Sequence, residues 1–353
     1  MKISDVDKNF VPDGIPADWD YELHSLSEPA FEIFGVTHTP DGFVRLPSEL
    51  AERVNDGVAI LYRNTAGGRV RFYTDSPYIL VFATARSVTD MVHMTRVGSA
   101  GFDVYSDGAY ACSLTAEWKR DGDIYCYCAA RALSASGEIT VNMPLYNDVA
   151  EMFIGVARGS TLLPSRRKYA HTHPVVYYGS SITQGGCASR PGMSYQAILS
   201  RRLNIDHINL GFSGSARGEG VMAEHIASLG MSAFVMDYDY NAPTVEHLRA
   251  THKPFFDVIR AAHPTLPIIM MSRPNYNLSE DDERCAVIRD TYNSAILSGD
   301  RNVYYISGRE LMADARDEGT VDGCHPTDLG FWSMANALEP VLAKALGLDG
   351  SNR

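Results

Sequence analysis

The chain lacks the features that mark membrane, secreted and disulfide-stabilised proteins. None of its apolar runs approaches the roughly 18 residues that a membrane-spanning helix requires. The first ten residues, MKISDVDKNF, are polar and acidic where a secretory signal has an apolar segment. The six cysteines match neither a disulfide framework nor a zinc knuckle. We therefore expect a cytoplasmic protein with reduced thiols and no membrane partner.

Positive charge is also scarce. Lysine and arginine number 31 against 43 aspartates and glutamates, which gives a formal net charge of −12. Phosphate backbones repel such a chain, so we expect no nucleic-acid partner. The densest basic stretch, residues 166–168, is interpreted as a solvated linker. The length of 353 residues fits two domains, and the composition leaves homo-oligomerisation open.

The first part of the chain, residues 1–165, has the pattern of an all-β domain. Residues 58–62 and 69–73 flank Asn-Thr-Ala-Gly-Gly at 64–68, which predicts a β-hairpin. Residues 106–108, Ser-Asp-Gly, indicate a tight turn. No helix-length amphipathic segment interrupts the pattern, so we predict a β-sandwich. Further strands are expected at residues 78–83, 102–105, 139–143 and 152–156.

A polar, basic segment bounded by prolines, residues 163–174, is predicted to link this domain to a second one at 170–353. Beyond it, short apolar runs alternate with stretches of helical periodicity. This alternation predicts an α/β domain whose parallel sheet is covered by helices on both faces. The last helix is expected at about 329–346. The five strands are expected at residues 175–178, 207–210, 233–236, 268–271 and 303–306.

The segments that follow these strands carry the residues suited to chemistry. In an open α/β sheet, ligands bind outside the carboxyl ends of the strands. Ser181 follows the first strand, and Asp322 and His325 stand just before the last helix. A serine hydroxyl is a poor nucleophile until a base takes its proton. His325 is the candidate base, and Asp322 is the candidate that orients it.

A tetrahedral oxyanion also needs hydrogen-bond donors. The backbone N–H groups of Ser181 and Gly214 and the amide of Asn241 are the candidates. Each feature has an ordinary structural explanation when taken singly, such as a turn glycine or a helix cap. Arg273 and Asn275 are candidate substrate-binding residues, and Arg273 is equally suited to pair with an acid such as Asp239.

Four blocks of the chain together resemble the SGNH (GDSL-like) hydrolases. The resemblance covers about residues 174–346, and it implies a flavodoxin-like domain with a five-stranded parallel sheet. It also implies that Ser181, Asp322 and His325 form a catalytic triad, with Ser180 in place of the usual aspartate of the family motif. The blocks are Gly-Ser-Ser181-Ile-Thr, Asn209-Leu-Gly-Phe-Ser-Gly214, Asp-Tyr-Asn241 and Asp322-Gly-Cys-His325-Pro.

The two-domain layout is similar to bacterial carbohydrate O-acetylesterases, as is the segment 183–192. This resemblance implies a jelly-roll-like sandwich ahead of an esterase that removes acetyl groups from carbohydrates such as acetylated mannan or xylan fragments. No metal and no cofactor are expected. Two alternatives remain: a general or lipid acyl ester hydrolase, and a carbohydrate-binding protein with an inactive hydrolase domain. The amino-terminal domain either holds the substrate or only stabilises its neighbour.

Other reactive side chains are given structural interpretations. Cys187 and Cys324, close to the motif blocks, are expected to pack beneath the site, with a redox switch or a metal pair as the alternative. His171 and His173 are interpreted as linker residues. Asp237 and Asp239 are expected to shape the Asn241 loop. Trp332 and Met334 are expected in the core. Cys126 and Cys128 are expected to face one side of a strand as a buried pair.

Overall fold

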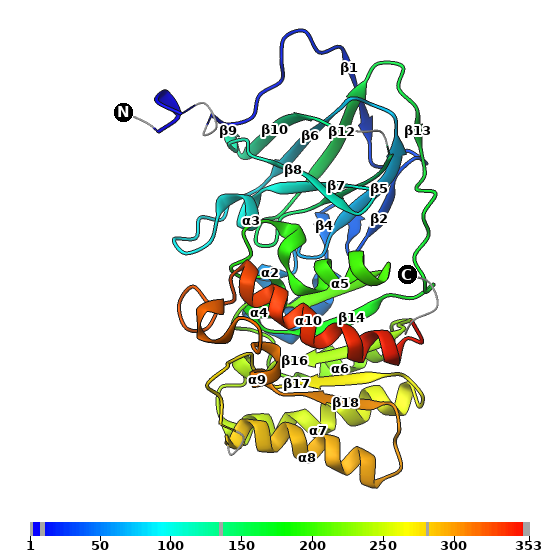
Figure 1. The fold of residues 1–353 in the computed structure, drawn as a ribbon, viewed down its shortest axis with the longest axis vertical. Coiled ribbons are helices and arrows are strands. Elements are labelled where there is room, and N and C mark those ends of the chain that lie inside the picture. Colours follow the sequence, from blue (N-terminus) through cyan, green and yellow to red (C-terminus); the bar gives the residue numbers. More distant parts are fainter. Residues whose placement is uncertain (1–2, 8–10, 134–136, 280–281, 349–353) are drawn as a thin grey trace.

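The computed structural model describes residues 3–7, 11–133, 137–279 and 282–348. An antiparallel β-rich part occupies one end of the long axis, and a parallel sheet with its helices occupies the other (Figure 1). The predicted fold class is confirmed. In the described part of the chain, no helix combines the length and the apolar character needed to cross a membrane. The polar amino-terminal segment, residues 1–10, lies partly outside the described residues.

Two antiparallel sheets form the sandwich around a core of alternating apolar side chains, among them Phe72, Val81 and Ile154. One sheet has the order β1-β12-β6-β10-β9, and the other has the order β13-β5-β11-β7-β8, with β2 paired to β5. The bounds are β1 Tyr21–Ser25, β2 Glu32–Phe34, β5 Arg69–Thr74, β6 Tyr78–Ala85, β7 Phe102–Ser106, β8 Ala109–Leu114, β9 Lys119–Asp121, β10 Ile124–Ala132, β11 Gly137–Asn142, β12 Glu151–Ala157 and β13 Leu162–Leu163. A separate hairpin joins β3 (Thr37–Thr39) to β4 (Gly42–Val44).

The predicted hairpin over residues 58–73 is wrong. Residues 56–61 form helix α2 (Asp56–Leu61), directly after α1 (Ser48–Val54), and a third helix, α3, spans Arg96–Ala100. The side chain of Asn55 caps α2 by accepting the N–H of Val58 at 3.0 Å. A short apolar run fits a strand and a buried helix equally well, so its periodicity could not decide between them. The turn at 106–108 does connect β7 to β8, with positive φ at Asp107 and Gly108.

The second sheet is parallel throughout and has the order β15-β14-β16-β17-β18. Its strands read as continuous apolar runs because helices cover both faces. All five were predicted to within one residue at either end. The bounds are β14 Val175–Gly179, β15 His207–Gly211, β16 Ala233–Asp237, β17 Ile268–Met271 and β18 Val303–Ile306.

Helices α5 and α10 pack on one face of this sheet, and α6, α7 and α8 pack on the other (Figure 1). Met334 lies in the core as expected, but Trp332 does not, since 47% of it is exposed and Arg202 covers its ring. The bounds are α4 Ser181–Gln184, η3 Pro191–Met193, α5 Tyr195–Leu203, α6 Gly220–Ala227, η4 Asp239–Asn241, α7 Val245–Ala262, α8 Glu283–Leu297, α9 Gly308–Leu311, η5 Arg316–Gly319 and α10 Asp328–Ala345.

Besides its own core, the amino-terminal part contributes side chains to the core of the parallel-sheet part. Val58 and Tyr62 from the amino-terminal part pack with the apolar side chains of the parallel sheet and α6. Leu145 and Tyr146 do the same on the opposite face of that sheet. The amino-terminal part therefore contributes to the core of the parallel-sheet part at two places.

Strand β15 lies at the edge of the parallel sheet, and the other part of the chain covers its free side. Alternate carbonyl groups of an edge strand have no partner within the sheet. The Arg69 guanidinium donates to the carbonyl of His207 at 3.2 Å, and Arg45 donates to those of Asn209 and Gly211 at 3.1 and 2.5 Å. Arg69 also pairs with Asp206. Two buried arginines thus supply the hydrogen-bond donors that a neighbouring strand would otherwise provide to β15.

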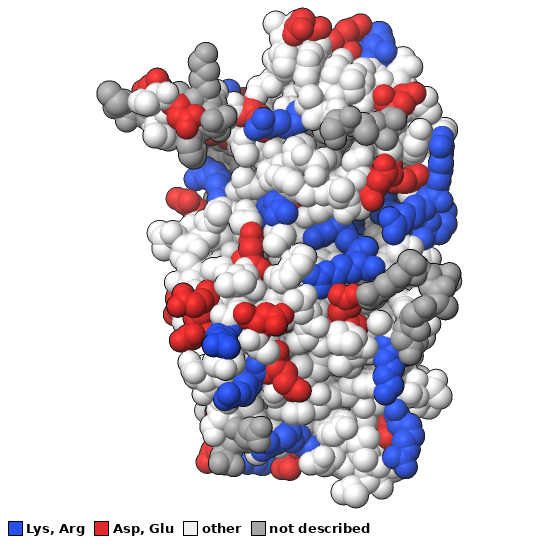
Figure 2. Space-filling view, in the orientation of Figure 1, with Lys and Arg blue, Asp and Glu red and all other residues white. Residues whose placement is uncertain are grey.

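Basic side chains gather where the two parts meet, on one side of the face in Figure 2. Arg69, Arg71, Arg167 and Arg201 line a cavity there. Residues 166–168 are all exposed, as expected of a solvated segment, and within it Arg166 lies over the ring of Tyr73 at 3.6 Å.

Candidate active site

Ser181 is placed by the turn between β14 and α4. It is the first residue of α4, and Ser180 is the residue that caps this helix. The Ser180 hydroxyl accepts the N–H of Ile182 at 3.2 Å and is almost fully buried. The Ser181 hydroxyl instead lies 2.9 Å from Nε2 of His325. The two neighbouring serines therefore have different partners, and only Ser181 faces the histidine.

Asp322 and His325 lie on the loop between η5 and α10. A bridge between Thr320 and Pro326 closes this loop, and Gly323 has a φ of +82° within it. His325 Nδ1 donates to Asp322 Oδ2 at 2.7 Å. With Nδ1 protonated, Nε2 is free to accept the Ser181 hydroxyl proton. The structure thus joins the three predicted residues in one chain of hydrogen bonds, although Asp322 and His325 lie 141 and 144 positions after Ser181 in the sequence.

The Asp322 carboxylate is held in its ionised form. Partial burial alone would raise its pKa, but hydrogen bonds to the carboxylate outweigh that effect and lower the pKa to about 2. Oδ1 accepts the backbone N–H groups of His325 and Cys324 at 2.7 and 3.0 Å, and Oδ2 accepts the His325 ring. A fixed negative charge next to the ring stabilises the imidazolium that forms when His325 accepts a proton.

The three candidate oxyanion donors lie on the loops that follow β14, β15 and β16. The N–H of Ser181 belongs to the first turn of α4, where amides have no acceptor within the helix. Gly214 has a φ of +67°, and an added Cβ would meet nothing within 4 Å, so the backbone here is open to an incoming group. The Asn241 amide donates one hydrogen to the Phe212 carbonyl at 2.9 Å, which leaves the other available.

Arg273 and Asn275 make contacts within their own neighbourhood. The Arg273 guanidinium lies 2.6 Å from Asp282 and 3.6 Å from Asp239. Of the two roles considered for Arg273, these contacts correspond to pairing with an acid. Asn275 accepts the N–H of Asn277 within its own turn. Neither contact involves Ser181, Asp322 or His325.

Asp237 and the two cysteines near the site make structural contacts. Asp237 accepts hydrogen bonds from Thr183 and Tyr195, at 2.8 and 3.1 Å. Burial raises the pKa of Cys187 to about 11, and it also raises that of Cys324, so both thiols stay protonated. All six cysteines are free; Cys126 and Cys128 are half-buried rather than buried.

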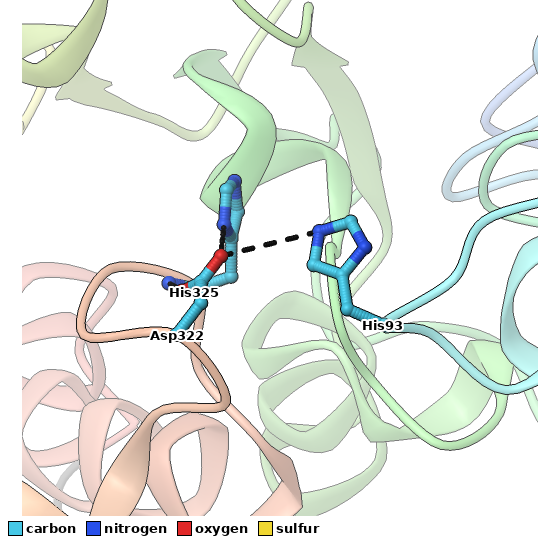
Figure 3. A group of neighbouring side chains, drawn as sticks. All are labelled: His93, Asp322 and His325. Carbon is cyan, nitrogen blue, oxygen red and sulfur yellow. Dashed lines mark hydrogen bonds and ion pairs between the residues drawn. The ribbon is translucent and has the colours of Figure 1, made fainter.

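The sandwich part contributes residues that sequence analysis missed. The Tyr146 hydroxyl donates to the Ser181 carbonyl at 3.1 Å. His93 lies beside the Asp322–His325 pair, with its Nε2 4.0 Å from Asp322 Oδ2 (Figure 3). A single histidine or tyrosine in a loop of a different domain carries no sequence pattern that would link it to this site.

Among the described residues, His93, Asp322 and His325 are also the one group of ligating side chains close enough to hold a metal ion, with ligand atoms within 4.8 Å of one another. An ion there would compete for the nitrogen and oxygen atoms that join His325 to Asp322. The arrangement therefore fits acid–base chemistry by the protein's own side chains better than a resident metal.

The fold and the site define an α/β ester hydrolase. Residues 172–343 match the GDSL-like Lipase/Acylhydrolase family, and residues 21–162 match the N-terminus of SGNH hydrolase-type esterases. The chain belongs to the GDSL-like SGNH hydrolases. The amino-terminal match is named for a GxDLY motif, which Gly101-Phe-Asp103-Val-Tyr105 follows with valine in place of leucine. Asp103 accepts the N–H of Gly192 at 2.9 Å, so this motif joins the sandwich to η3 of the second part.

Solved structures share the whole two-part architecture. One is a Bacteroides ovatus protein assigned as a GDSL-like lipase, with 28% identity, a TM-score of 0.80 and coverage of 93% of this chain and 98% of that one. A salicylyl-acyltransferase of a tetracycline biosynthetic pathway has 21% identity, a TM-score of 0.74 and the same coverage. A family two carbohydrate esterase from Clostridium thermocellum has 15% identity and a TM-score of 0.58, covering 80% and 93%. A comparison with curated proteins finds no match.

Proposed function

We propose that this protein is a serine esterase that removes O-acetyl groups from carbohydrates, with Ser181 as the nucleophile, His325 as the base and Asp322 as the residue that orients it. The observation that carries the proposal is the unbroken chain of hydrogen bonds from Ser181 Oγ through the His325 ring to Asp322. It matches the arrangement that activates a serine for acyl transfer.

The reaction proceeds in two halves. Ser181 Oγ attacks the ester carbonyl while His325 Nε2 takes its proton, and the oxyanion accepts hydrogen bonds from the N–H groups of Ser181 and Gly214 and the Asn241 amide. The C–O bond to the sugar then breaks, and His325 returns the proton to the sugar oxygen. In the second half a water molecule gives its proton to His325 and attacks the acyl-enzyme. Acetate leaves, and Ser181 regains its proton.

Two features support a small acyl group on a polar alcohol. Ser181 is only 8% exposed, which restricts the room around the nucleophile. The segment after β17, Asn275-Tyr-Asn-Leu-Ser, is polar, whereas a long acyl chain requires an extended apolar groove. Family two carbohydrate esterases and an acetyl xylan esterase share the fold, which is consistent with this substrate class.

The test is acetate release from acetylated xylan and mannan oligosaccharides, beside p-nitrophenyl esters of increasing chain length. We expect acetyl esters to be hydrolysed fastest. Ser181→Ala should lose at least about 10³-fold in kcat, whereas Ser180→Ala, the matched control, should retain an active Ser181 with a less stable α4. Preference for long chains would favour a general or lipid esterase. Sugar binding without any ester hydrolysis would indicate a binding protein.

A further inference from the structure

The segment between β6 and α3 carries His93 from the sandwich to the Asp322 loop. His93 Nε2 lies 4.0 Å from Asp322 Oδ2, and its ring meets that of His325 edge to face, with centroids 5.6 Å apart and planes at 77°. Figure 3 shows the His93 ring approaching the carboxylate from a different segment of the chain than His325. About a third of the His93 side chain is exposed.

This segment is anchored on both sides of His93. Before it, Thr89 donates its N–H to Asn147 Oδ1 at 2.8 Å and its hydroxyl to the Tyr146 carbonyl at 2.6 Å. After it, Met94 is buried in the core beside α4, and the Thr95 hydroxyl donates to the Ser189 carbonyl. Both ends of the segment are therefore fixed, which places His93 beside the Asp322 loop.

Asp322 itself is fixed mainly by its own loop. Oδ1 already accepts two backbone N–H groups, and Oδ2 accepts one hydrogen bond from His325, which leaves a further acceptor site on Oδ2. Of the described side chains outside this loop, His93 is the one within ion-pair distance of the carboxylate. At 4.0 Å the contact is longer than a direct hydrogen bond, a range in which a bridging water or a small ring movement completes the interaction.

We propose that His93 is a positioning residue for catalysis, supplied by the amino-terminal domain. It restrains the Asp322 carboxylate on its open side and the His325 ring on its edge, so that Nε2 of His325 stays directed at Ser181. A displacement of about 1 Å in such a group can cost about 10²-fold in rate. This inference rests on the proposed serine mechanism, and it gives the sandwich a role in catalysis beyond stabilising the fold.

The test compares His93→Ala and His93→Gln with a matched control, His38→Ala. His38 is a half-exposed sandwich histidine whose Nε2 lies 3.8 Å from an acid, Glu151, away from the site. With p-nitrophenyl acetate we expect His93→Ala to lower kcat by about 10- to 10²-fold with KM nearly unchanged. His93→Gln, which keeps an N–H donor at similar reach, should recover most of this loss, and His38→Ala should equal the wild type.

A double-mutant cycle separates positioning from a general structural effect. In an Asp322→Asn background, His93→Ala should lower kcat by a smaller factor than in the wild type, because one of the two groups that it restrains is already changed. The same fold-loss in both backgrounds would overturn the proposal, as would wild-type kcat in His93→Ala. A rise in KM alone would also overturn it by making His93 a substrate contact. If His93→Ala does not fold, His93→Leu, which keeps apolar bulk and removes both ring nitrogens, carries the same comparison in the two backgrounds.

The two proposals fail in different ways. An active Ser181→Ala enzyme would refute the serine mechanism. An inactive Ser181→Ala enzyme together with a fully active His93→Ala enzyme would refute only the role of His93.

Discussion

Replacing Arg45 should test how firmly the two parts of the chain depend on each other. The Arg45 guanidinium is buried and donates to four carbonyl groups. Two belong to its own part of the chain and two to the edge strand β15, and its planar group also lies 4.4 Å from the centre of the Phe212 ring. The acceptors are Leu61, Asn64, Asn209 and Gly211. Arg45→Met keeps similar apolar bulk but removes every donor.

The magnitude follows from these contacts. A hydrogen bond from a charged donor contributes about 1.5–3 kcal/mol, and a buried carbonyl left without a partner costs about 1–3 kcal/mol. Removing the charge also removes its desolvation cost, which offsets part of the loss. We therefore expect Arg45→Met to lower the free energy of unfolding by about 3–5 kcal/mol. Because Phe212 precedes Gly214, kcat should fall as well.

The assay is chemical unfolding followed by tryptophan fluorescence, with kcat for p-nitrophenyl acetate measured below the transition. The matched control is Arg158→Met, since Arg158 is 60% exposed and pairs with Asp20 at the surface. A surface pair of this kind contributes at most about 1 kcal/mol. If Arg45→Met and Arg158→Met were equally stable, the covering of β15 by Arg45 would not be important for stability.

Three further predictions concern the site and its surroundings. Asn241→Ala should lower kcat by about 10²–10³-fold with little change in KM; Asn277→Ala is the control, and a loss of substrate affinity alone would make Asn241 a substrate ligand. Prolonged EDTA treatment should leave activity unchanged, while Zn²⁺ should inhibit by competing for His325; loss of activity on chelation, restored by a divalent metal, would contradict the serine mechanism. Burial raises the pKa of Asp237 to about 7 despite hydrogen bonds from Thr183 and Tyr195. Between pH about 4 and 7 the folded state therefore holds a proton that the unfolded chain releases, so stability from this group falls as pH rises, by about 2–4 kcal/mol. Asp237→Asn should flatten urea-unfolding stability across this window, and an unchanged slope would show that Asp237 is ionised in the folded protein.

The parallel sheet could be predicted from the sequence because its strands are buried on both faces and read as continuous apolar runs. Val175–Gly179 and Ile268–Met271 are examples. Residues 56–61 could not be assigned correctly in the same way. Their apolar run is too short to show a period, and the decisive feature was the Asn55 cap. Trp332 shows a related limit of sequence-based prediction. It was expected in the core, but its ring lies at the surface against the guanidinium of Arg202.

The site was predictable where its residues belong to ordered motifs along one sheet edge. The placement of Ser181, Gly214, Asn241 and the Asp322–His325 pair along this edge follows from strand order, while their catalytic roles remain a proposal. His93 does not, because its place depends on how a sandwich loop docks more than 220 positions away from Asp322 in the sequence. Contacts of this kind depend on tertiary packing, and no local pattern records them.

The two arginines that cover β15 have a consequence for how such chains can be recombined. A domain whose sheet edge is covered by side chains of another domain cannot be combined with an unrelated domain without exposing that edge. A foreign sandwich fused to residues 170–353 would leave the carbonyl groups of His207, Asn209 and Gly211 facing outwards, ready to pair with a strand of a second molecule. Chimaeras of this protein should therefore transfer Arg45 and Arg69 together with the sandwich, or place the boundary elsewhere, if the edge of the sheet is to stay covered.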